Sequence, residues 1–363
     1  MFSLKELNDK NQTYQHPVEV GRFSTDENQR FRHGNQEMSY FAPPKTKRKE
    51  WKRIVLDEPF DLNHGFPTQF VTRDPNQKGR LQTILNWILA NRDKFSPSTN
   101  QMVTKRRCLD KLMRTNYDKG ESWMLVAQKF KGVIYLNDVH AEKVRQSMSG
   151  EKRERMRYIG HKFEKYVTVP CNNTKMGIKE RRERVVKTKE AYFSVISSRF
   201  GNNLPIIFGT QIDCVDKGKG FLGSPANHIE LKTTKMLTCF KQEQSFLRYK
   251  LQKWWSEAYL SGTPAIVCGF RDEKGLVRSL EKFEVGELPS LAWQHLEGSP
   301  WSPAKCVRFT GNVLWEIAKA MKNVDEIDTC CVVSWELDFV EMKLEKNCEN
   351  AFLPGWYVDE MSK

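Results

Sequence analysis

The residues with the clearest capacity for chemistry lie between positions 213 and 232. Asp213 comes late in an apolar segment, and Glu230 and Lys232 flank Leu231 after sixteen intervening residues. Successive side chains of a strand point to opposite faces, so Glu230 and Lys232 share one face while Leu231 points to the core. If the two segments pair as strands, Asp213 lies beside Glu230. The spacing therefore predicts two carboxylates and one ammonium group on one sheet face.

A face of this kind is costly to bury unless its charges have partners. A divalent cation is a suitable partner, because Mg²⁺ prefers carboxylate oxygens and retains waters. Such an ion would polarise a phosphoryl oxygen, and a second ion about 3.5–4 Å away would stabilise the leaving oxygen. Lys232 would orient the attacking water or neutralise developing charge. The D…E-x-K pattern is that of PD-(D/E)xK nucleases, for which we expect one or two Mg²⁺ or Mn²⁺ ions.

The same short pattern also fits an ordinary strand hairpin with a surface Glu–Lys pair. Two further carboxylates are candidates for the same site as the D…E-x-K residues. Glu164 lies on a charged helix one turn after Gly160, which leaves room for a ligand, and Glu257 lies on a later helix four residues after Lys253. Each also fits a solvated helix position, and an i,i+4 pair with Lys253 is worth only about 0.2–0.5 kcal/mol.

The elements that must position these residues follow from the spacing of apolar side chains. Strands are expected over residues 123–130, 132–136, 191–197, 204–215, 228–234, 264–270 and 329–337. Helices are expected over residues 80–95, 150–168, 242–260 and 303–321. This mixed order predicts an α/β (mixed α+β) fold, a single large domain with central mixed β-sheets flanked by helices and a PD-(D/E)xK-like core.

The length of 363 residues exceeds the need of one ordinary core, yet no linker divides the chain. We expect a polar N-terminal arm over residues 1–50, packed on or beside the core, and the nuclease domain over residues 51–363. Apolar residues make up 39%, which excludes wholesale disorder.

The net charge of +14 favours polyanionic partners such as nucleic acid, although a merely soluble basic protein carries such a charge too. Nine scattered cysteines without zinc spacing indicate a reducing compartment. No apolar stretch is long enough to span a bilayer, so we expect no membrane partner. The basic cluster Lys45–Arg53 fits nuclear import or a solvated charge run. We expect the nucleus, with the cytoplasm as a second location.

Several longer segments resemble the DXO/Rai family of RNA decapping nucleases, and the likeness runs almost end to end. The segments that carry it are Val18–Ser24, Ile159–Tyr166 (family G-x-x-F-E-x-Y), Gly209–Cys214 (at the family's E-h-D, h being apolar), Glu230–Thr233 (E-L-K-T), Lys253–Glu257 (at K-W-W-x-Q), Gly269–Asp272, Ala351–Pro354 and Trp356–Val358. The resemblance implies a single α/β domain whose deep pocket admits an RNA 5′ end. It also implies hydrolysis within or beside 5′ caps, including incomplete and NAD-type caps.

By position in these motifs, the resemblance also assigns roles. Glu164, Asp213 and Glu230 would ligate the metal ions, together with the Leu231 carbonyl. Lys232 would contact the scissile phosphate. Substrate contacts are expected from Arg106, at the family's W-R-G, and from its neighbours Lys105 and Arg107. An arginine suits the RNA backbone through its planar donor fork.

The sequence departs from the family pattern at several of these positions. Gln211 replaces the Glu of E-h-D, a metal ligand, and Glu257 replaces the Gln of K-W-W-x-Q, a substrate contact. We therefore include Gln211 among the metal and substrate ligands and Glu257 among the substrate contacts. An amide oxygen still ligates Mg²⁺ but carries no charge, so weaker metal affinity is expected. Lys105 and Arg107 replace the Trp and the Gly of the family's W-R-G motif, and Ser39 stands where the family tends to have a basic residue.

Two function hypotheses follow. The first is a metal-dependent RNA 5′-end decapping hydrolase and 5′–3′ exoribonuclease in RNA 5′-end quality control, favoured by the surviving Asp213, Glu230, Lys232 and Glu164. The second is a catalytically weak or inactive member, like the insect protein Cutoff, that binds RNA 5′ ends or protein partners to regulate transcription termination or small-RNA precursor production. Gln211 and the run Lys105-Arg106-Arg107 favour the second. A DNA nuclease of the wider class fits the charge, but the family motifs argue against it.

The partners expected from these hypotheses are RNA 5′ ends. A 5′–3′ exoribonuclease and chromatin or transcription proteins are further candidates, chiefly under the second hypothesis.

Overall fold

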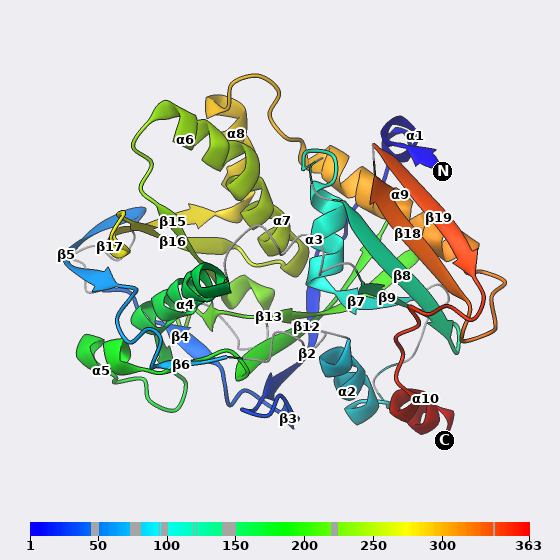
Figure 1. Ribbon diagram of the computed structural model, residues 1–363, viewed down its shortest axis with the longest axis horizontal. Coiled ribbons are helices and arrows are strands. Elements are labelled where there is room, and N and C mark those ends of the chain that lie inside the picture. The colour runs from blue at the N-terminus through cyan, green and yellow to red at the C-terminus, as the bar shows by residue number, and fades with distance from the viewer. Residues whose placement is uncertain are drawn as a thin grey trace.

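The computed structural model describes residues 1–44, 51–72, 81–93, 95, 101–118, 120, 122–139, 150–218, 224–336 and 338–363. Most of the basic cluster predicted at Lys45–Arg53 lies outside these ranges. The described chain forms two large mixed β-sheets with helices on their faces (Figure 1). This arrangement confirms the predicted mixed α/β class. No helix among the described residues is long and apolar enough to cross a membrane.

The larger sheet has ten strands and contains both parallel and antiparallel pairs. In spatial order its strands are β1 (Phe2–Ser3), β19 (Phe339–Glu345), β18 (Cys330–Glu336), β8 (Trp123–Phe130), β9 (Val133–Asp138), β7 (Met102–Lys105), β13 (Leu204–Gln211), β12 (Ala191–Phe200), β2 (Val18–Thr25) and β3 (Phe31–His33).

The second sheet has seven strands and carries the E-x-K segment near its middle. In spatial order its strands are β10 (Thr168–Pro170), β4 (Ser39–Phe41), β14 (Cys214–Val215), β15 (His228–Lys235), β16 (Ala265–Arg271), β17 (Leu276–Glu284) and β5 (Arg53–Asp61). A small parallel pair joins β11 (Val186–Lys187) to β6 (Phe70–Val71).

The strand predicted over residues 204–215 is two strands in two different sheets. The Ile212 N–H still donates to the Tyr192 carbonyl (2.9 Å), which extends the register of the ten-stranded sheet. After Asp213 the chain pairs with β15 instead, Cys214 opposite Ile229. Thr210, Ile212 and Cys214 are buried on both sides of the change, so the alternation typical of one strand continues across it. Asp213 therefore lies at the junction of the two sheets.

The first 44 residues are built into both sheets. β2 pairs with β12 in the ten-stranded sheet, and β4 pairs with β10 and β14 in the seven-stranded one. The predicted arm thus contacts the core through backbone ladders. Its predicted boundary at residue 50 stays a prediction, since residues 45–50 lie outside the described part.

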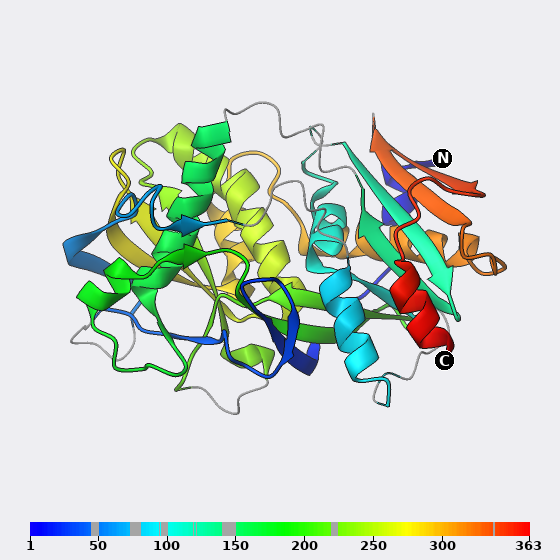
Figure 2. The same cartoon turned by 60° about the horizontal axis from the view of Figure 1, so that its bottom comes forward.

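The helices cover the sheets and deliver the remaining site residues (Figure 2). They are α1 (Leu4–Asp9), α2 (Gln82–Ala90), α3 (Arg106–Arg114), α4 (Gly150–Val167), α5 (Ile178–Glu183), α6 (Phe240–Ser245), α7 (Leu251–Ser261), α8 (Leu288–His295), α9 (Pro303–Ala320) and α10 (Gly355–Ser362). The helix predicted over residues 242–260 is α6 and α7 joined by a π-helical turn, Phe246–Lys250. α3 was not predicted.

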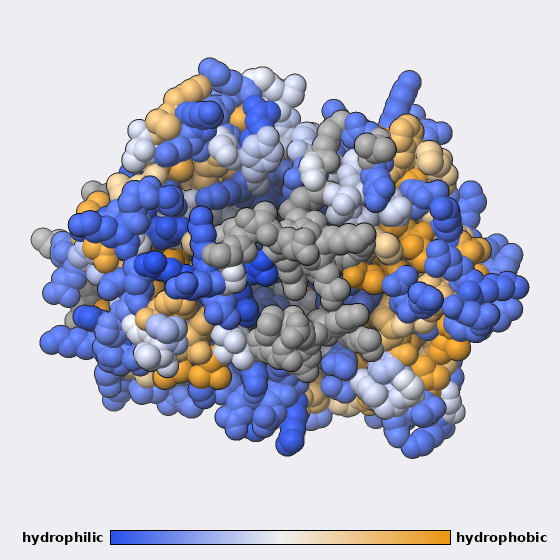
Figure 3. Space-filling model, viewed as in Figure 1, coloured by the Kyte–Doolittle hydropathy of each residue, from blue (hydrophilic) through white to orange (hydrophobic). Residues whose placement is uncertain are grey.

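α4 packs against the seven-stranded sheet, where Ile159 and Phe163 join the core of Leu231 and Val267. Gly269 on β16 permits this approach, because a Cβ there would lie 2.6 Å from the Phe163 ring. The largest core packs α3, α7 and α9 on the ten-stranded sheet. On the face seen in Figure 3, hydrophilic residues predominate and hydrophobic residues gather in smaller areas.

Candidate active site

The predicted alternation on β15 is confirmed. Leu231 is 6% exposed and joins the apolar core of the seven-stranded sheet. Glu230 and Lys232 point to the other face, and the Lys232 Nζ lies 2.8 Å from Glu230 Oε1. Asp213 lies beside them, because the Leu231 backbone N–H donates to Asp213 Oδ2 at 2.8 Å. The hairpin with an exposed Glu–Lys pair is excluded, since the Glu230 side chain is only 5% exposed.

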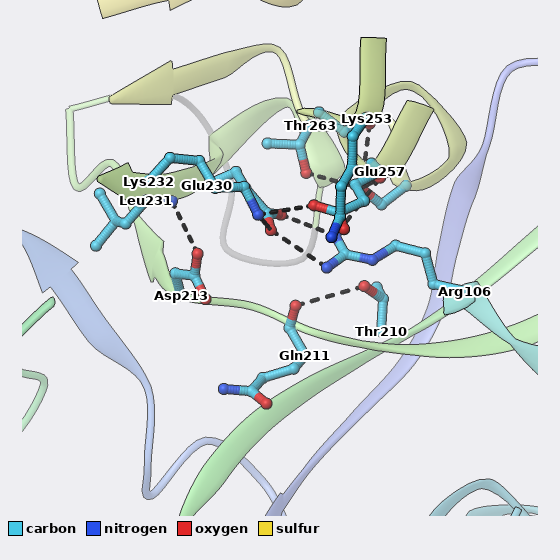
Figure 4. A network of polar contacts seen from close by, with 12 residues as sticks. Arg106, Thr210, Gln211, Asp213, Glu230, Leu231, Lys232, Lys253, Glu257 and Thr263 are labelled. Carbon is cyan, nitrogen blue, oxygen red and sulfur yellow. Dashed lines mark hydrogen bonds and ion pairs between the residues drawn. The ribbon is translucent and has the colours of Figure 1, made fainter. Parts of the chain in front are cut away.

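Arg106 reaches the same carboxylate from the first turn of α3. Its Nη1 and Nη2 donate to the two oxygens of Glu230 at 2.8 and 3.2 Å (Figure 4). β7 brings it there, because Lys105 at the end of β7 lies opposite Gly209 in the neighbouring strand β13. A forked arginine–carboxylate pair is among the stronger charge-assisted contacts in proteins.

Glu257 on α7 completes the group. Its Oε2 accepts from Lys232 Nζ at 2.7 Å, and its backbone oxygen lies 3.5 Å from Arg106 Nη1. Figure 4 shows Arg106, Lys232, Glu230 and Glu257 pointing toward one another. Four side chains from three separate elements, α3, β15 and α7, therefore form one cluster with two positive and two negative charges.

Burial and neighbouring charges shift the pKa values of the cluster strongly. Burial alone would raise the pKa of Glu230, but Arg106 and Lys232 hold it well below its ordinary value. Burial would lower the pKa of Lys232, yet Glu230 and Glu257 raise it above the usual range. For Asp213, burial and then repulsion by Glu230 and Glu164 outweigh the lowering effect of Lys232 and of the Leu231 N–H, so its pKa lies well above normal. Asp213 is thus the carboxyl whose charge is least well compensated.

Glu164 lies on α4, on the side of the helix near Asp213. Its Oε1 is 3.0 Å from His161 Nδ1, one turn earlier, and its side chain is 21% exposed. Burial raises the pKa of Glu164, but His161 outweighs it and lowers the value overall. His161 was not singled out from the sequence, although the i,i+3 spacing with Glu164 was a usable signal. A Cβ at Gly160 would meet nothing within 4 Å, in keeping with the predicted open space.

The structure does not bring every predicted site residue into this cluster. Gln211 ends β13 with an exposed side chain, and its amide points away from the Arg106–Glu230 group (Figure 4). Arg107 follows Arg106 but turns elsewhere, with Nε 3.4 Å from Asp138 Oδ2 and its side chain 58% exposed. Lys105 is half-buried at the start of α3.

The donor atoms of the predicted ligands suit a divalent cation. Glu164, Asp213, Glu230 and the Leu231 carbonyl supply the oxygens that Mg²⁺ and Mn²⁺ prefer. As the described side chains stand, no three of Asp, Glu, His or Cys are gathered so as to hold an ion. In the structure Arg106 and Lys232 engage Glu230 instead. The charge of the Asp213 carboxylate is poorly compensated, which favours a bound cation. The four predicted oxygen ligands therefore fit a divalent ion once Glu230 shares its carboxylate between that ion and the two cationic side chains.

The chain matches known proteins over nearly its whole length. A model of the RAI1-like PD-(D/E)XK nucleases matches residues 15–358. The human decapping and exoribonuclease protein is 32% identical over 358 residues, covering 96% of this chain and 86% of that protein. The decapping nuclease RAI1 of Neurospora crassa is 29% identical over 318 residues, covering 84% and 73%.

Solved structures share the fold. Rai1 of Candida albicans in complex with pU5 and Mn²⁺ has a TM-score of 0.83 at 20% identity, covering 98% of this chain and 97% of that one. Rai1 of Scheffersomyces stipitis in complex with 3′-NADP⁺ and calcium has a TM-score of 0.83 at 21% identity, covering 100% of both. Both sheets and the helices that carry the site therefore belong to a known architecture.

Proposed function

Because the chain belongs to the family of RAI1-like PD-(D/E)XK nucleases, we propose that it is a metal-dependent hydrolase of RNA 5′ ends. It removes incomplete and NAD-type caps and degrades the RNA body in the 5′-to-3′ direction, as part of RNA 5′-end quality control. The observation that carries this proposal is the buried face of β15, where Glu230 and Lys232 lie beside Asp213. The names of the relatives support it.

In this proposal Glu164, Asp213, Glu230 and the Leu231 carbonyl hold a divalent ion, Mg²⁺ or Mn²⁺. When bound, such an ion supplies Lewis-acid polarisation of a phosphoryl oxygen and a more acidic water. Lys232 lies 2.8 Å from Glu230 Oε1, within reach of a phosphate held there, and its ammonium neutralises charge that develops on the phosphoryl oxygens.

Arg106 binds the RNA backbone in this proposal. Its guanidinium forks onto Glu230 in the structure, and the same fork fits two phosphate oxygens. An RNA phosphate that enters the site thus offers Arg106 an alternative anion, which releases Glu230 toward the ion. Substrate and ion then favour each other's binding.

The test is cleavage of defined RNA ends by the purified protein. With Mn²⁺ or Mg²⁺ present, RNAs bearing a 5′-monophosphate, a triphosphate or an NAD cap are expected to release nucleotides or the cap. Asp213→Ala is expected to abolish release. The matched control Asp325→Ala removes an exposed carboxylate (94% exposed side chain) and is expected to retain activity.

A member that only binds RNA ends or protein partners is the second function weighed. The decapping and exoribonuclease names of the relatives favour the enzyme. Wild-type protein that binds 5′-monophosphate RNA without any turnover, at several concentrations of either metal, would overturn the enzymatic proposal in favour of the binding one.

A further inference from the structure

Glu257 is the second carboxylate that contacts Lys232, the lysine of the E-x-K segment. Lys232 Nζ bridges two carboxylates, Glu230 Oε1 at 2.8 Å and Glu257 Oε2 at 2.7 Å. We propose that Glu257 is a positioning residue that anchors Lys232 and thereby leaves Glu230 able to share its carboxylate with a divalent cation. The inference rests on the proposed function only in taking Glu230 as an ion ligand.

The charge around Glu230 shows why a second anion matters. Three N–H donors converge on its two oxygens, two from Arg106 at 2.8 and 3.2 Å and one from Lys232 at 2.8 Å. Without Glu257, both cations would be compensated by Glu230, and a divalent ion would have to displace them. With Glu257 present, Lys232 keeps an anionic partner when Glu230 turns to the ion. The cost of freeing Glu230 is correspondingly smaller.

α7 holds Glu257 rigidly for this task. Its neighbours Trp254 and Trp255 are buried, at 6% and 2% exposure, and Ser256 Oγ donates to Asp110. The Glu257 backbone oxygen accepts from Ser261 Oγ at 3.1 Å and lies 3.5 Å from Arg106 Nη1. One residue therefore touches both cations, Arg106 through its carbonyl and Lys232 through its carboxylate.

The position of Glu257 is a costly one for a charge. Its side chain is only 16% exposed, and a carboxylate taken out of water is stabilising only if its partners repay the desolvation. A neutral side chain of similar size would pack there without that cost. The Glu257 carboxylate therefore orients neighbouring side chains rather than stabilising the fold. Groups around a metal site orient the ligands of the ion in the same way.

The experiment measures Mn²⁺ affinity by titration calorimetry and needs no turnover, so it is independent of whether RNA is cleaved. Glu257→Gln is expected to weaken Mn²⁺ binding by about tenfold or more, the usual effect of losing a group that orients a ligand. The matched control is Glu273→Gln, which breaks an exposed pair between Glu273, in the turn after β16, and Lys235, on the same strand as Lys232 (Lys235 Nζ to Glu273 Oε2, 2.6 Å). That control is expected to leave the affinity unchanged.

A double-mutant cycle separates anchoring from direct ligation. In a Lys232→Met background, Glu257→Gln is expected to change Mn²⁺ affinity by less than about threefold, because the lysine through which Glu257 acts is gone. A tenfold loss in that background would show that Glu257 touches the ion itself and would overturn the proposal. So would an unchanged affinity of the single variant. Melting temperatures without metal establish that each variant is folded, and Glu257→Asp, which keeps the charge, should recover part of the lost affinity.

Discussion

Two buried charged groups share strand β15, and they differ in how completely their charges are paired. At the start of the strand, His228 Nε2 lies 3.3 Å from Glu19 Oε2, with side chains only 3% and 2% exposed. Ser194 Oγ donates to the same Glu19 oxygen at 2.7 Å, and Arg22 Nε lies 3.3 Å from the other. We call this group closed because both Glu19 oxygens have side-chain partners, although His228 Nδ1 is buried without a hydrogen bond to any described residue. The group links β2 and β12 of one sheet to β15 of the other.

Two residues further along the same face, the Glu230 group is only partly closed. Arg106 and Lys232 keep 17% and 20% of their side chains exposed, and Asp213 accepts a backbone N–H instead of a cationic side chain. Burial, followed by repulsion from Glu230 and Glu164, raises the pKa of Asp213. Burial also acts to raise the pKa of Glu19, but the hydrogen bonds from His228 and Ser194 outweigh it, so that pKa is lowered. One face of β15 therefore carries two charged groups. In the Glu19 group the carboxylate is fully paired, and in the Glu230 group Asp213 has no cationic partner within hydrogen-bond distance among the described residues, as the proposed ion site requires.

The sharpest test of this comparison is Lys232→Met. We expect RNA cleavage to fall by about a thousandfold, the upper range for removing one group that stabilises a transition-state charge. The fold should persist, because Glu230 keeps Arg106. Single-turnover cleavage of 5′-monophosphate RNA and a melting curve measure both. Cleavage within tenfold of wild type would remove Lys232 from the catalytic group.

Glu19→Ala should have the opposite signature. It leaves His228 and Arg22 without their buried anion, so we expect a loss of about 3 kcal/mol in the free energy of unfolding. Activity per folded molecule should be unchanged. Urea unfolding measures the loss, and Glu273→Ala, in an exposed pair, is the control with an expected change below about 1 kcal/mol. If the Glu19 variant unfolds like wild type, the group around Glu19 does not contribute to the stability of the fold.

The substitution Gln211→Glu tests whether the ion site around Glu230 and Asp213 also includes the last residue of β13. If the side chain at this position turns toward Asp213 when an ion binds, the added charge should tighten Mn²⁺ binding by about tenfold. Calorimetry measures the change. Unaltered affinity would place position 211 outside the ion site, as the direction of the Gln211 amide in Figure 4 suggests.

Arg107→Ala should have the smallest effect. Its side chain is largely exposed and paired with Asp138, so we expect RNA affinity to weaken a few-fold and the salt dependence to drop by about one counterion. Binding measured at several salt concentrations gives both values. An unchanged slope would mean that Arg107 contacts no phosphate, in contrast to the role proposed for Arg106 beside it.

The sequence by itself determined the alternation of Glu230, Leu231 and Lys232, because the strand period is a local property that the buried Leu231 enforces. Spacing of apolar residues also located α4, α9, β12 and β16 to within a few residues. The family resemblance pointed to Glu164 and Arg106, which no local pattern could assign to the site.

Only the tertiary structure decided how the charges are shared. The chain changes sheets at Asp213 while the alternation of buried residues continues, and α3, which aims Arg106 at Glu230, was not predicted. Contacts such as Lys232 to Glu257 join residues 25 apart from a strand and a helix, so their geometry depends on packing between elements. Periodicity fixes which face a side chain occupies, whereas the partner across that face is set by the fold.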